Sequence, residues 1–294
     1  MPIASPPGDP ALIGYPRAQL VVPGTLGTFY CVSRCVRRAF LCGQDAVSGR
    51  SFEHRKAWLE QRLFELADLF SLSVLAYAVM SNHLHGVVRV DPGHAAGWSD
   101  DEVAVRWVRL FRARVESTVD AAACQRKALA LLGDFERLAV RRQCLANLSW
   151  FMRCLAVGAQ RLVDAQRPSP LARLANREDR CSGRFWEGRF WEGRSKCQAL
   201  LDDAAVLAWM AYVDLNPVRA GVAGDLPGSD HTSITQRLQT TAADDPQPLT
   251  AIAGIPLLGF LPINGADYIR LVDWTGRQLH PSKRGVIAAP TRPA

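Results

Sequence analysis

The sequence has no run of about 18 consecutive apolar residues, so no part of it is expected to span a membrane. Its N-terminus carries neither a charged segment nor an apolar stretch after it, so no export signal is expected. Its eight cysteines include no C-x-x-C pair, which argues against a zinc knuckle and, without export, against a disulfide framework. We therefore expect a cytoplasmic protein with reduced thiols at Cys31, Cys35, Cys42, Cys124, Cys144, Cys154, Cys181 and Cys197.

Lysine is scarce as well, because 31 of the 35 basic residues are arginine. The planar guanidinium fork of arginine suits contacts to phosphate, and a net charge of +7 indicates a nucleic-acid partner. A GC-rich genome also favours arginine, and both explanations can hold together. The chain of 294 residues, 48% of them hydrophobic, can bury a core as one large domain with extensions or as two small domains.

The first part of the chain follows a β-α-β-β pattern. A segment rich in β-formers predicts a strand at 28–33, and apolar residues at helical spacing predict a helix at 51–70. Two more apolar segments, 71–80 and 84–90, are joined by a short connection that favours an antiparallel pair.

Helical patterns dominate the middle of the chain. Ser99 followed by Glu102 is typical of a capping box and predicts a helix to about residue 117. Its arginines 106, 109 and 112 share one side, for which a solvated face is the ordinary explanation. Residues 119–166 predict two or three inserted helices, and 199–215 predict a strongly apolar helix that ends before Pro217.

These patterns predict three regions. Residues 1–20 form a flexible leader, 21–225 form the main domain with the helical insertion at about 119–166, and 226–294 form a C-terminal extension.

Between the insertion and the 199–215 helix lies a basic, loop-like segment with a tandem repeat. Arg-Phe-Trp-Glu-Gly occurs at 184–188 and again at 189–193. Aromatic residues interleaved with arginine can stack on unpaired bases and contact phosphates. The alternative is an aromatic loop packed on the core, although four large aromatics within seven residues are hard to bury fully.

The segment 77–90 holds a His-x-His motif after the polar break Ser81-Asn82. In a strand His83 and His85 point to one face and Leu84 to the other, into a core. Two adjacent imidazoles suit a divalent metal. The alternative is a pair of partly exposed strand histidines without a ligand.

Tyr212 and Asn216 lie four residues apart and share a face near the end of the 199–215 helix. The Asn216 carbonyl oxygen could complete a His/amide/water shell, which suits Mg²⁺ or Mn²⁺ better than structural Zn²⁺. A deprotonated tyrosine held in line with a DNA phosphate can act as a nucleophile. The alternative for Tyr212 is a helix aromatic with a buried ring and a surface hydroxyl.

In this order, the segments 77–85, 190–194 and 211–221 resemble motifs of the REP-associated tyrosine transposases, of the HUH single-tyrosine superfamily. The segments 33–40 and 271–276 are also similar to the longer proteobacterial members. The resemblance implies an α+β fold with a ferredoxin-like or RRM-like antiparallel sheet and flanking helices.

The resemblance also implies a chemistry. His83 and His85 match the metal pair, Asn216 the position that completes the metal site, and Tyr212 the nucleophile. The implied activity is Mg²⁺- or Mn²⁺-dependent cleavage and joining of single-stranded DNA near palindromic hairpin repeats, through a 5′-phosphotyrosine. The basic strand end and the basic loop are expected to contact the DNA through Arg34, Arg37, Arg38, Arg184, Arg189, Trp191, Arg194 and Lys196.

The tandem repeat departs from the family pattern, which has one Phe-Trp-Glu-Gly-Arg. If the five extra residues disturb the docking of the next helix, the protein would be an inactive domesticated transposase that binds hairpin DNA or RNA. Another HUH enzyme, a relaxase or replication initiator, is less well supported. Relaxases often have a third histidine near the metal pair and sometimes several tyrosines close together. In this sequence the nearest extra histidine, His94, is expected in a loop, and Tyr212 stands alone.

Overall fold

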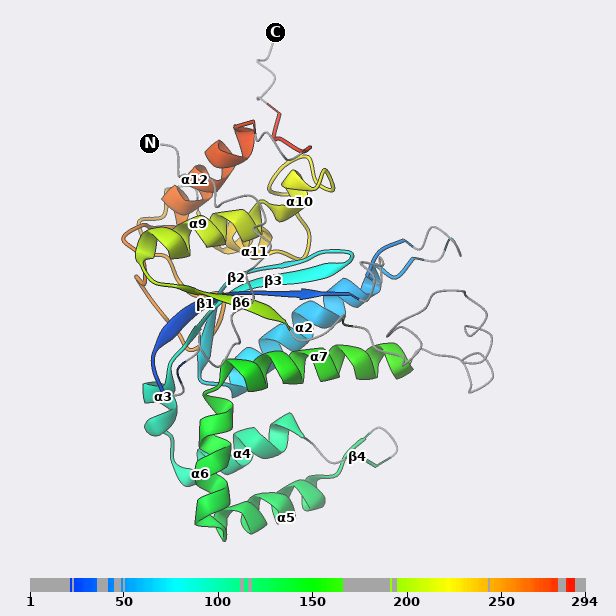
Figure 1. Cartoon of the computed structure of the whole chain (residues 1–294), viewed down its shortest axis with the longest axis vertical. Coiled ribbons are helices and arrows are strands. Elements are labelled where there is room, and N and C mark those ends of the chain that lie inside the picture. Colours follow the sequence, from blue (N-terminus) through cyan, green and yellow to red (C-terminus); the bar gives the residue numbers. More distant parts are fainter. Residues whose placement is uncertain are drawn as a thin grey trace.

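An antiparallel five-stranded sheet forms the centre of the computed structural model (Figure 1). The structure describes residues 22, 24–35, 42–44, 49, 51–111, 114–115, 118–165, 191, 195–242, 244–279 and 284–288. Across the sheet the strands run in the order β6 (Lys196–Leu200), β1 (Gly27–Arg34), β3 (His83–Val90), β2 (Leu72–Val79) and β7 (Ala253–Gly254). The expected α+β fold, an antiparallel sheet with flanking helices, is confirmed.

Helices cover both faces of this sheet. Helix α9 (Asp203–Asp214) packs on β2, β3 and β6, whereas α2 (His54–Leu69) packs on the opposite face together with α7 (Leu148–Ala165). Strand β2 is buried at all eight positions because it is covered on both sides. Side chains alternate between two cores, so Leu84 enters the α2 core as predicted while Val87 enters the α9 core.

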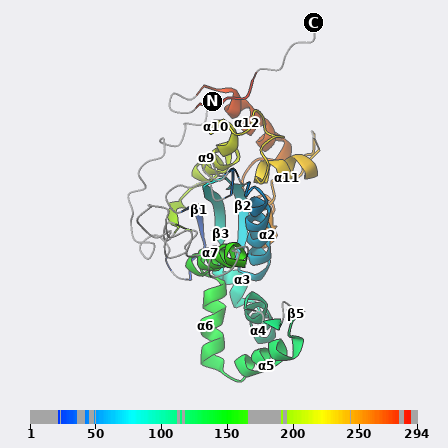
Figure 2. The same cartoon turned by 90° about the vertical axis from the view of Figure 1, so that its right-hand side faces the viewer.

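The predicted insertion consists of three helices among the described residues, α5 (Ala121–Leu132), α6 (Phe135–Leu145) and α7. Figure 2 shows α4 (Asp100–Leu110), α5 and α6 extending beyond the end of the sheet. The capping box at Ser99 and Glu102 is present. The predicted helix end at 117 is wrong, because α4 ends at Leu110 and the two-residue strands β4 (Arg114–Val115) and β5 (Thr118–Val119) follow.

The arginines on α4 tie this helix to α2 rather than forming a solvated face. Arg106 lies over the Trp98 ring at 4.3 Å and donates to the Asp68 carbonyl oxygen at 2.6 Å. Arg109 pairs with the Asp68 carboxylate at 2.9 Å. Arg112 lies outside the described residues.

Strand β6 corrects the prediction for the segment before α9. Residues 196–197 were expected in a loop and 199–202 in a helix, yet 196–200 pair with β1 in register. The helix begins only at Asp203, because the Asp202 side chain accepts a hydrogen bond from the Ala205 amide at 2.7 Å and caps it. Pairing with a strand distant in sequence overrides the local helical pattern.

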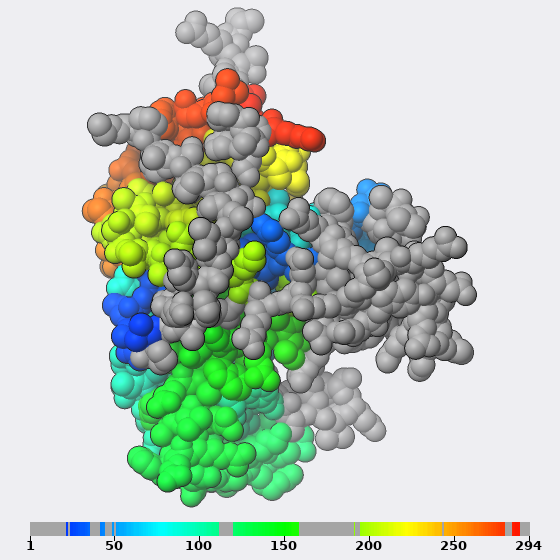
Figure 3. Space-filling view, viewed as in Figure 1, coloured from blue at the N-terminus to red at the C-terminus, as the bar shows by residue number. Residues whose placement is uncertain are grey.

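The C-terminal residues belong to the core on the α9 side of the sheet. Their elements are α10 (Asn216–Arg219), α11 (Ser233–Thr240), β7 and α12 (Gly265–Arg277). In the space-filling view, α9 and α12 form the upper part of this face and the insertion helices the lower part (Figure 3). Ile234, Tyr268 and Val272 belong to the same buried cluster as Val206 and Met210 of α9. The part of the chain after residue 226 is therefore packed on the sheet domain, and the boundary at 225 stays a prediction.

The remaining short helix, α3 (Pro92–Ala96), follows β3 directly. None of the helices in the described ranges is long and apolar enough to cross a membrane.

A substitution at Gly254 can test whether the edge strand β7 is an integral part of the sheet. Its φ is +89°, and a Cβ atom there would lie 2.1 Å from the Leu72 carbonyl oxygen. We expect Gly254→Ala to lower the free energy of unfolding by about 2 kcal/mol or more, measured by urea denaturation, because backbone must shift to admit the methyl group.

Gly224 provides the matched control, since a Cβ atom there would meet nothing within 4 Å. Gly224→Ala is expected to leave the unfolding midpoint nearly unchanged. Equal effects of both substitutions would contradict the pairing of β7 with β2.

Candidate functional site

The register of β1 with its neighbours brings the His-x-His motif together with basic residues on one sheet face. Arg34 lies directly opposite His83, and Val32 lies opposite His85 on one side and Lys196 on the other. Residues directly opposite each other in antiparallel strands share a face. This is the face covered by α9.

His85 is held from both ring nitrogens. Its Nδ1 lies 2.6 Å from the Tyr30 hydroxyl, and its Nε2 lies 3.2 Å from the Asn216 side-chain nitrogen. Since the Asn216 amide nitrogen donates, Nε2 accepts, and Nδ1 then carries the proton and donates to Tyr30 Oη. The side chain is only 4% exposed, so its orientation is fixed.

His83 is oriented in a similar manner. The Asn82 side-chain oxygen accepts a hydrogen bond from His83 Nδ1, so the lone pair of this imidazole is on Nε2. The two rings lie 4.4 Å apart between centroids at an angle of 88°. Both histidines therefore carry an Nε2 lone pair on the same face of the sheet.

Tyr212 on α9 reaches the same place. Its ring packs edge-on against His85 at 5.9 Å, Trp209 at 5.3 Å and Tyr30 at 6.2 Å. These three ring contacts restrict the orientation of the Tyr212 ring, while its side chain as a whole is only half-buried. The geometry brings the Tyr212 ring beside His85.

Asn216 begins the short helix α10, one turn beyond Tyr212. Pro217 follows it at the first turn, where the missing amide hydrogen costs nothing. This turn places the Asn216 amide group against His85 Nε2. The cluster of His83, His85, Tyr212 and Asn216, here called the His-Tyr-Asn cluster, is thus assembled from β3, the end of α9 and the start of α10.

The end of α9 is anchored by a buried carboxylate. Asp214 is fully buried and accepts hydrogen bonds from the hydroxyls of Ser233, on α11, and Tyr268, on α12, the latter at 2.5 Å. Arg237 lies near it and donates to the Leu75 carbonyl oxygen of β2 at 2.9 Å. Burial raises the pKa of Asp214, although both hydroxyls and Arg237 act in the opposite direction.

The predicted DNA-contacting residues fall into three groups. Arg34 and Lys196 lie in neighbouring pairs on the face of the cluster, and Lys196 is exposed. Trp191 is 7% exposed and belongs to the α2-side core, so the prediction that its ring is offered to bases is wrong. The others, Arg37, Arg38, Arg184, Arg189 and Arg194, lie outside the described residues.

The sequence reasoning missed Tyr30. Strand alternation puts Tyr30 on the same face as Val32 and Arg34. Its proximity to His85 follows only from the pairing of β1 with β3, which the local sequence does not record. His94, expected in a loop, lies in α3 with its ring 5.7 Å from Trp98, outside the cluster.

The donor set fits a hard divalent cation. In this structure the Asn216 amide nitrogen occupies the Nε2 lone pair of His85. A metal bound by both imidazoles would require this amide to turn, and its carbonyl oxygen could then complete three protein ligands. Among the described residues no group of three His, Cys, Asp or Glu side chains could hold a metal ion. A metal at this cluster would therefore take further oxygen ligands from water or substrate, which suits Mg²⁺ or Mn²⁺.

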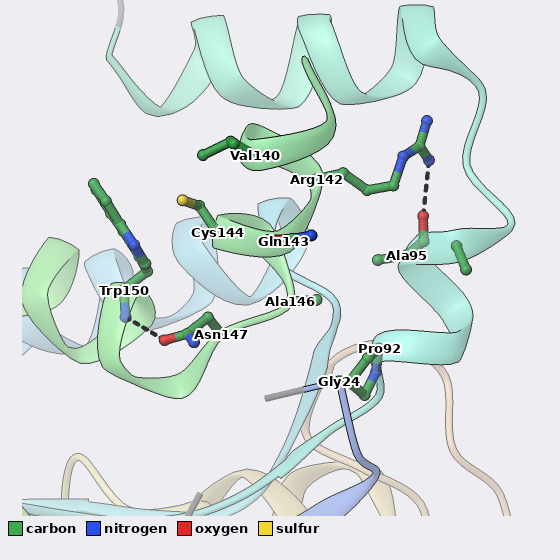
Figure 4. A pocket seen from close by; sticks show the side chains of 11 residues that line it. Gly24, Pro92, Ala95, Val140, Arg142, Gln143, Cys144, Ala146, Asn147 and Trp150 are labelled. Carbon is green, nitrogen blue, oxygen red and sulfur yellow. Dashed lines mark hydrogen bonds between the residues drawn. The ribbon is translucent and has the colours of Figure 1, made fainter. Parts of the chain in front are cut away.

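A pocket of about 470 Å³ lies elsewhere, between α3, α6 and α7 (Figure 4). Arg142 donates to the carbonyl oxygens of Ala95 and Trp98, at 2.9 and 2.5 Å, and Asn147 accepts from the Trp150 amide at 3.2 Å. These groups hold the helices together, and none of the lining residues belongs to the His-Tyr-Asn cluster.

The fold and the cluster define an α+β protein whose antiparallel sheet carries two histidines, a tyrosine and an asparagine on one face. No protein-family model matches the chain. No curated protein matches it either.

A solved structure of a REP-associated tyrosine transposase bound to a REP hairpin is similar to this chain. The likeness covers 72% of this chain and 79% of the other, with 10% sequence identity and a TM-score of 0.32. A likeness this small carries no argument about function.

Asp214→Asn should make the unfolding free energy less dependent on pH. Because the pKa of Asp214 is raised in the folded state, its stabilising contribution is complete below the unfolded value of about 4 and declines as pH rises through the folded pKa. The difference in unfolding free energy between wild type and Asp214→Asn, from urea titrations between pH 4.5 and 8, should therefore shrink with rising pH.

Asp244→Asn is the control, because the Asp244 side chain is 92% exposed. Its difference from wild type should stay small at every pH. A difference for Asp214→Asn that grows with pH would mean that the buried carboxylate is stabilised as the anion.

Proposed function

We propose that this protein cleaves and rejoins single-stranded DNA at palindromic hairpin repeats through a 5′-phosphotyrosine on Tyr212. The observation that carries the proposal is the convergence of Tyr212 with His83, His85 and Asn216 on one sheet face. A half-buried tyrosine restrained by three aromatic rings beside two imidazoles suits nucleophilic attack on a phosphate better than it suits packing alone.

Apart from proton transfer, the proposed reaction breaks and forms only P–O bonds, so it needs no oxidant or reductant. The Tyr212 phenolic oxygen attacks a DNA phosphorus and forms a P–O bond, the P–O3′ bond breaks, and the released 3′-oxygen takes up a proton. Attack by a 3′-hydroxyl on the phosphotyrosine reverses these bond changes and rejoins a strand. The phosphate ester is conserved throughout, so no nucleotide cofactor is required.

His83, His85 and Asn216 would hold a Mg²⁺ or Mn²⁺ ion, which polarises and orients the phosphate when bound. Asn82 and Tyr30 hold both imidazoles as the tautomer with a lone pair on Nε2. Arg34 and Lys196 supply positive charge on the same face, where a DNA backbone has to approach.

Tyr212 is a better candidate for the nucleophile than the neighbouring Tyr30. Tyr30 is 4% exposed, and its hydroxyl is engaged with His85 Nδ1 at 2.6 Å. Tyr212 is half-buried and lies on the helix that faces the sheet. Of the two, Tyr212 has the more exposed side chain.

The catalytically inactive alternative, a hairpin DNA- or RNA-binding protein, depends on the tandem repeat disturbing α9. Strand β6, directly after the repeat, pairs with β1 over residues 28–32, and α9 packs on the sheet with Tyr212 beside His85. The described residues therefore favour the enzyme.

Tyr212→Phe should abolish cleavage and the covalent adduct. Removing one oxygen leaves the ring packing nearly unchanged, so a loss of roughly 10⁴-fold or more is expected from removal of the nucleophile alone. The measurement is gel analysis of a labelled single-stranded hairpin taken from beside the gene, with Mn²⁺ and with EDTA.

Tyr30→Phe cannot serve as the control there because it contacts His85, so Tyr77→Phe on the opposite face is used instead. Cleavage that persists in Tyr212→Phe would exclude the phosphotyrosine route. Tight hairpin binding without cleavage by the wild type under any metal would support the inactive binding protein.

His83→Ala should reduce cleavage by at least about 100-fold while sparing hairpin affinity, because it removes a metal ligand from a half-exposed position. Hairpin affinity without metal, measured by fluorescence anisotropy, provides the comparison. Equal losses of affinity and cleavage would show that His83 serves the fold or the DNA-contacting surface instead.

A further inference from the structure

Tyr30 is linked to the candidate site by a buried hydrogen bond to His85. Its hydroxyl lies 2.6 Å from His85 Nδ1, and its side chain is 4% exposed. The ring stacks on Trp209 of α9 with 4.0 Å between centroids and 24° between planes. The hydroxyl is therefore held in one place by the centre of the sheet and by the helix that carries Tyr212.

The other nitrogen of His85 faces the cluster. Nε2 lies 3.2 Å from the Asn216 amide nitrogen, which requires an unprotonated Nε2 and a proton on Nδ1. A protonated Nδ1 needs an acceptor in this buried place, and the Tyr30 oxygen is the acceptor that the geometry provides. Loss of that acceptor would permit the opposite tautomer, in which Nε2 carries the proton and cannot bind a metal.

We infer that Tyr30 is a positioning residue that fixes His85 in the Nδ1-protonated tautomer, in which Nε2 is unprotonated and could bind a metal once the Asn216 amide nitrogen turns away from it. The inference rests on the proposed metal-binding role of His85. Mutation of the residue that orients a metal-binding histidine commonly weakens metal affinity by roughly 10- to 100-fold. Tyr30 itself does not touch the substrate or the metal in this assignment.

The chain offers a matched control in Tyr77. Its hydroxyl donates to Glu60 Oε1 at 2.6 Å, and its ring is fully buried on the opposite face of the sheet. Tyr30→Phe and Tyr77→Phe each remove one oxygen from a buried, hydrogen-bonded tyrosine. Only the first removes a contact to His85.

The first experiment follows the imidazole tautomers by long-range ¹H–¹⁵N NMR of the full-length protein without added metal. We expect His85 to show a protonated Nδ1 in wild type and in Tyr77→Phe, and a mixture of tautomers in Tyr30→Phe. An unchanged His85 tautomer in Tyr30→Phe would overturn the inference, whether or not the protein cleaves DNA.

The second experiment measures Mn²⁺ affinity by isothermal titration. Tyr30→Phe should weaken binding by roughly 10-fold or more, and Tyr77→Phe should leave it near the wild-type value. Equal weakening in both variants would indicate a general loosening of the fold and contradict the assignment. If the wild type binds no Mn²⁺ while the NMR tautomer still depends on Tyr30, the metal role fails and the positioning of His85 by Tyr30 stands.

Discussion

The pairing of β1 with β3 in one register is the constraint on which the site depends. It places Tyr30, Val32 and Arg34 on the same face as His83 and His85, and the buried Tyr30 hydroxyl lies against the His85 ring. A slip by one residue would turn every side chain of β1 to the other face and bury Phe29 and Cys31 against α9. The apolar alternation that fills two separate cores therefore also sets the chemistry of the exposed end of the sheet.

The second constraint is the attachment of α9. A helix with apolar residues on most of its surface could pack on a sheet at several rotations, and packing alone selects among them weakly. The fully buried Asp214 removes this freedom, because its oxygens must meet the hydroxyls of Ser233 and Tyr268. Tyr212 lies two residues before this anchor, so the C-terminal helices determine the orientation of the tyrosine although they lie outside the cluster.

Part of the fold and of the candidate site could be predicted from local sequence patterns. Alternation and helical spacing predicted β1, α2, β2 and β3. The resemblance to the REP-associated tyrosine transposases grouped His83, His85, Tyr212 and Asn216, which lie close together in the structure. Strand β6 and the burial of Trp191 depend on pairing across more than 150 residues, which a local pattern does not record. Tyr30 was missed for the same reason, since its importance arises from a partner 55 residues away.

Both ends of α9 are fixed by contacts that the structure describes. The repeat lies before β6, whose five residues pair with β1, and Asp202 starts α9 only after that strand. At its other end α9 is fixed by Asp214, so within the described part of the chain each end of the helix has its own anchor. Extra residues upstream then change the length of a connection, whose closure entropy varies slowly with length. Displacement of the tyrosine helix is therefore not the expected consequence of the five extra residues.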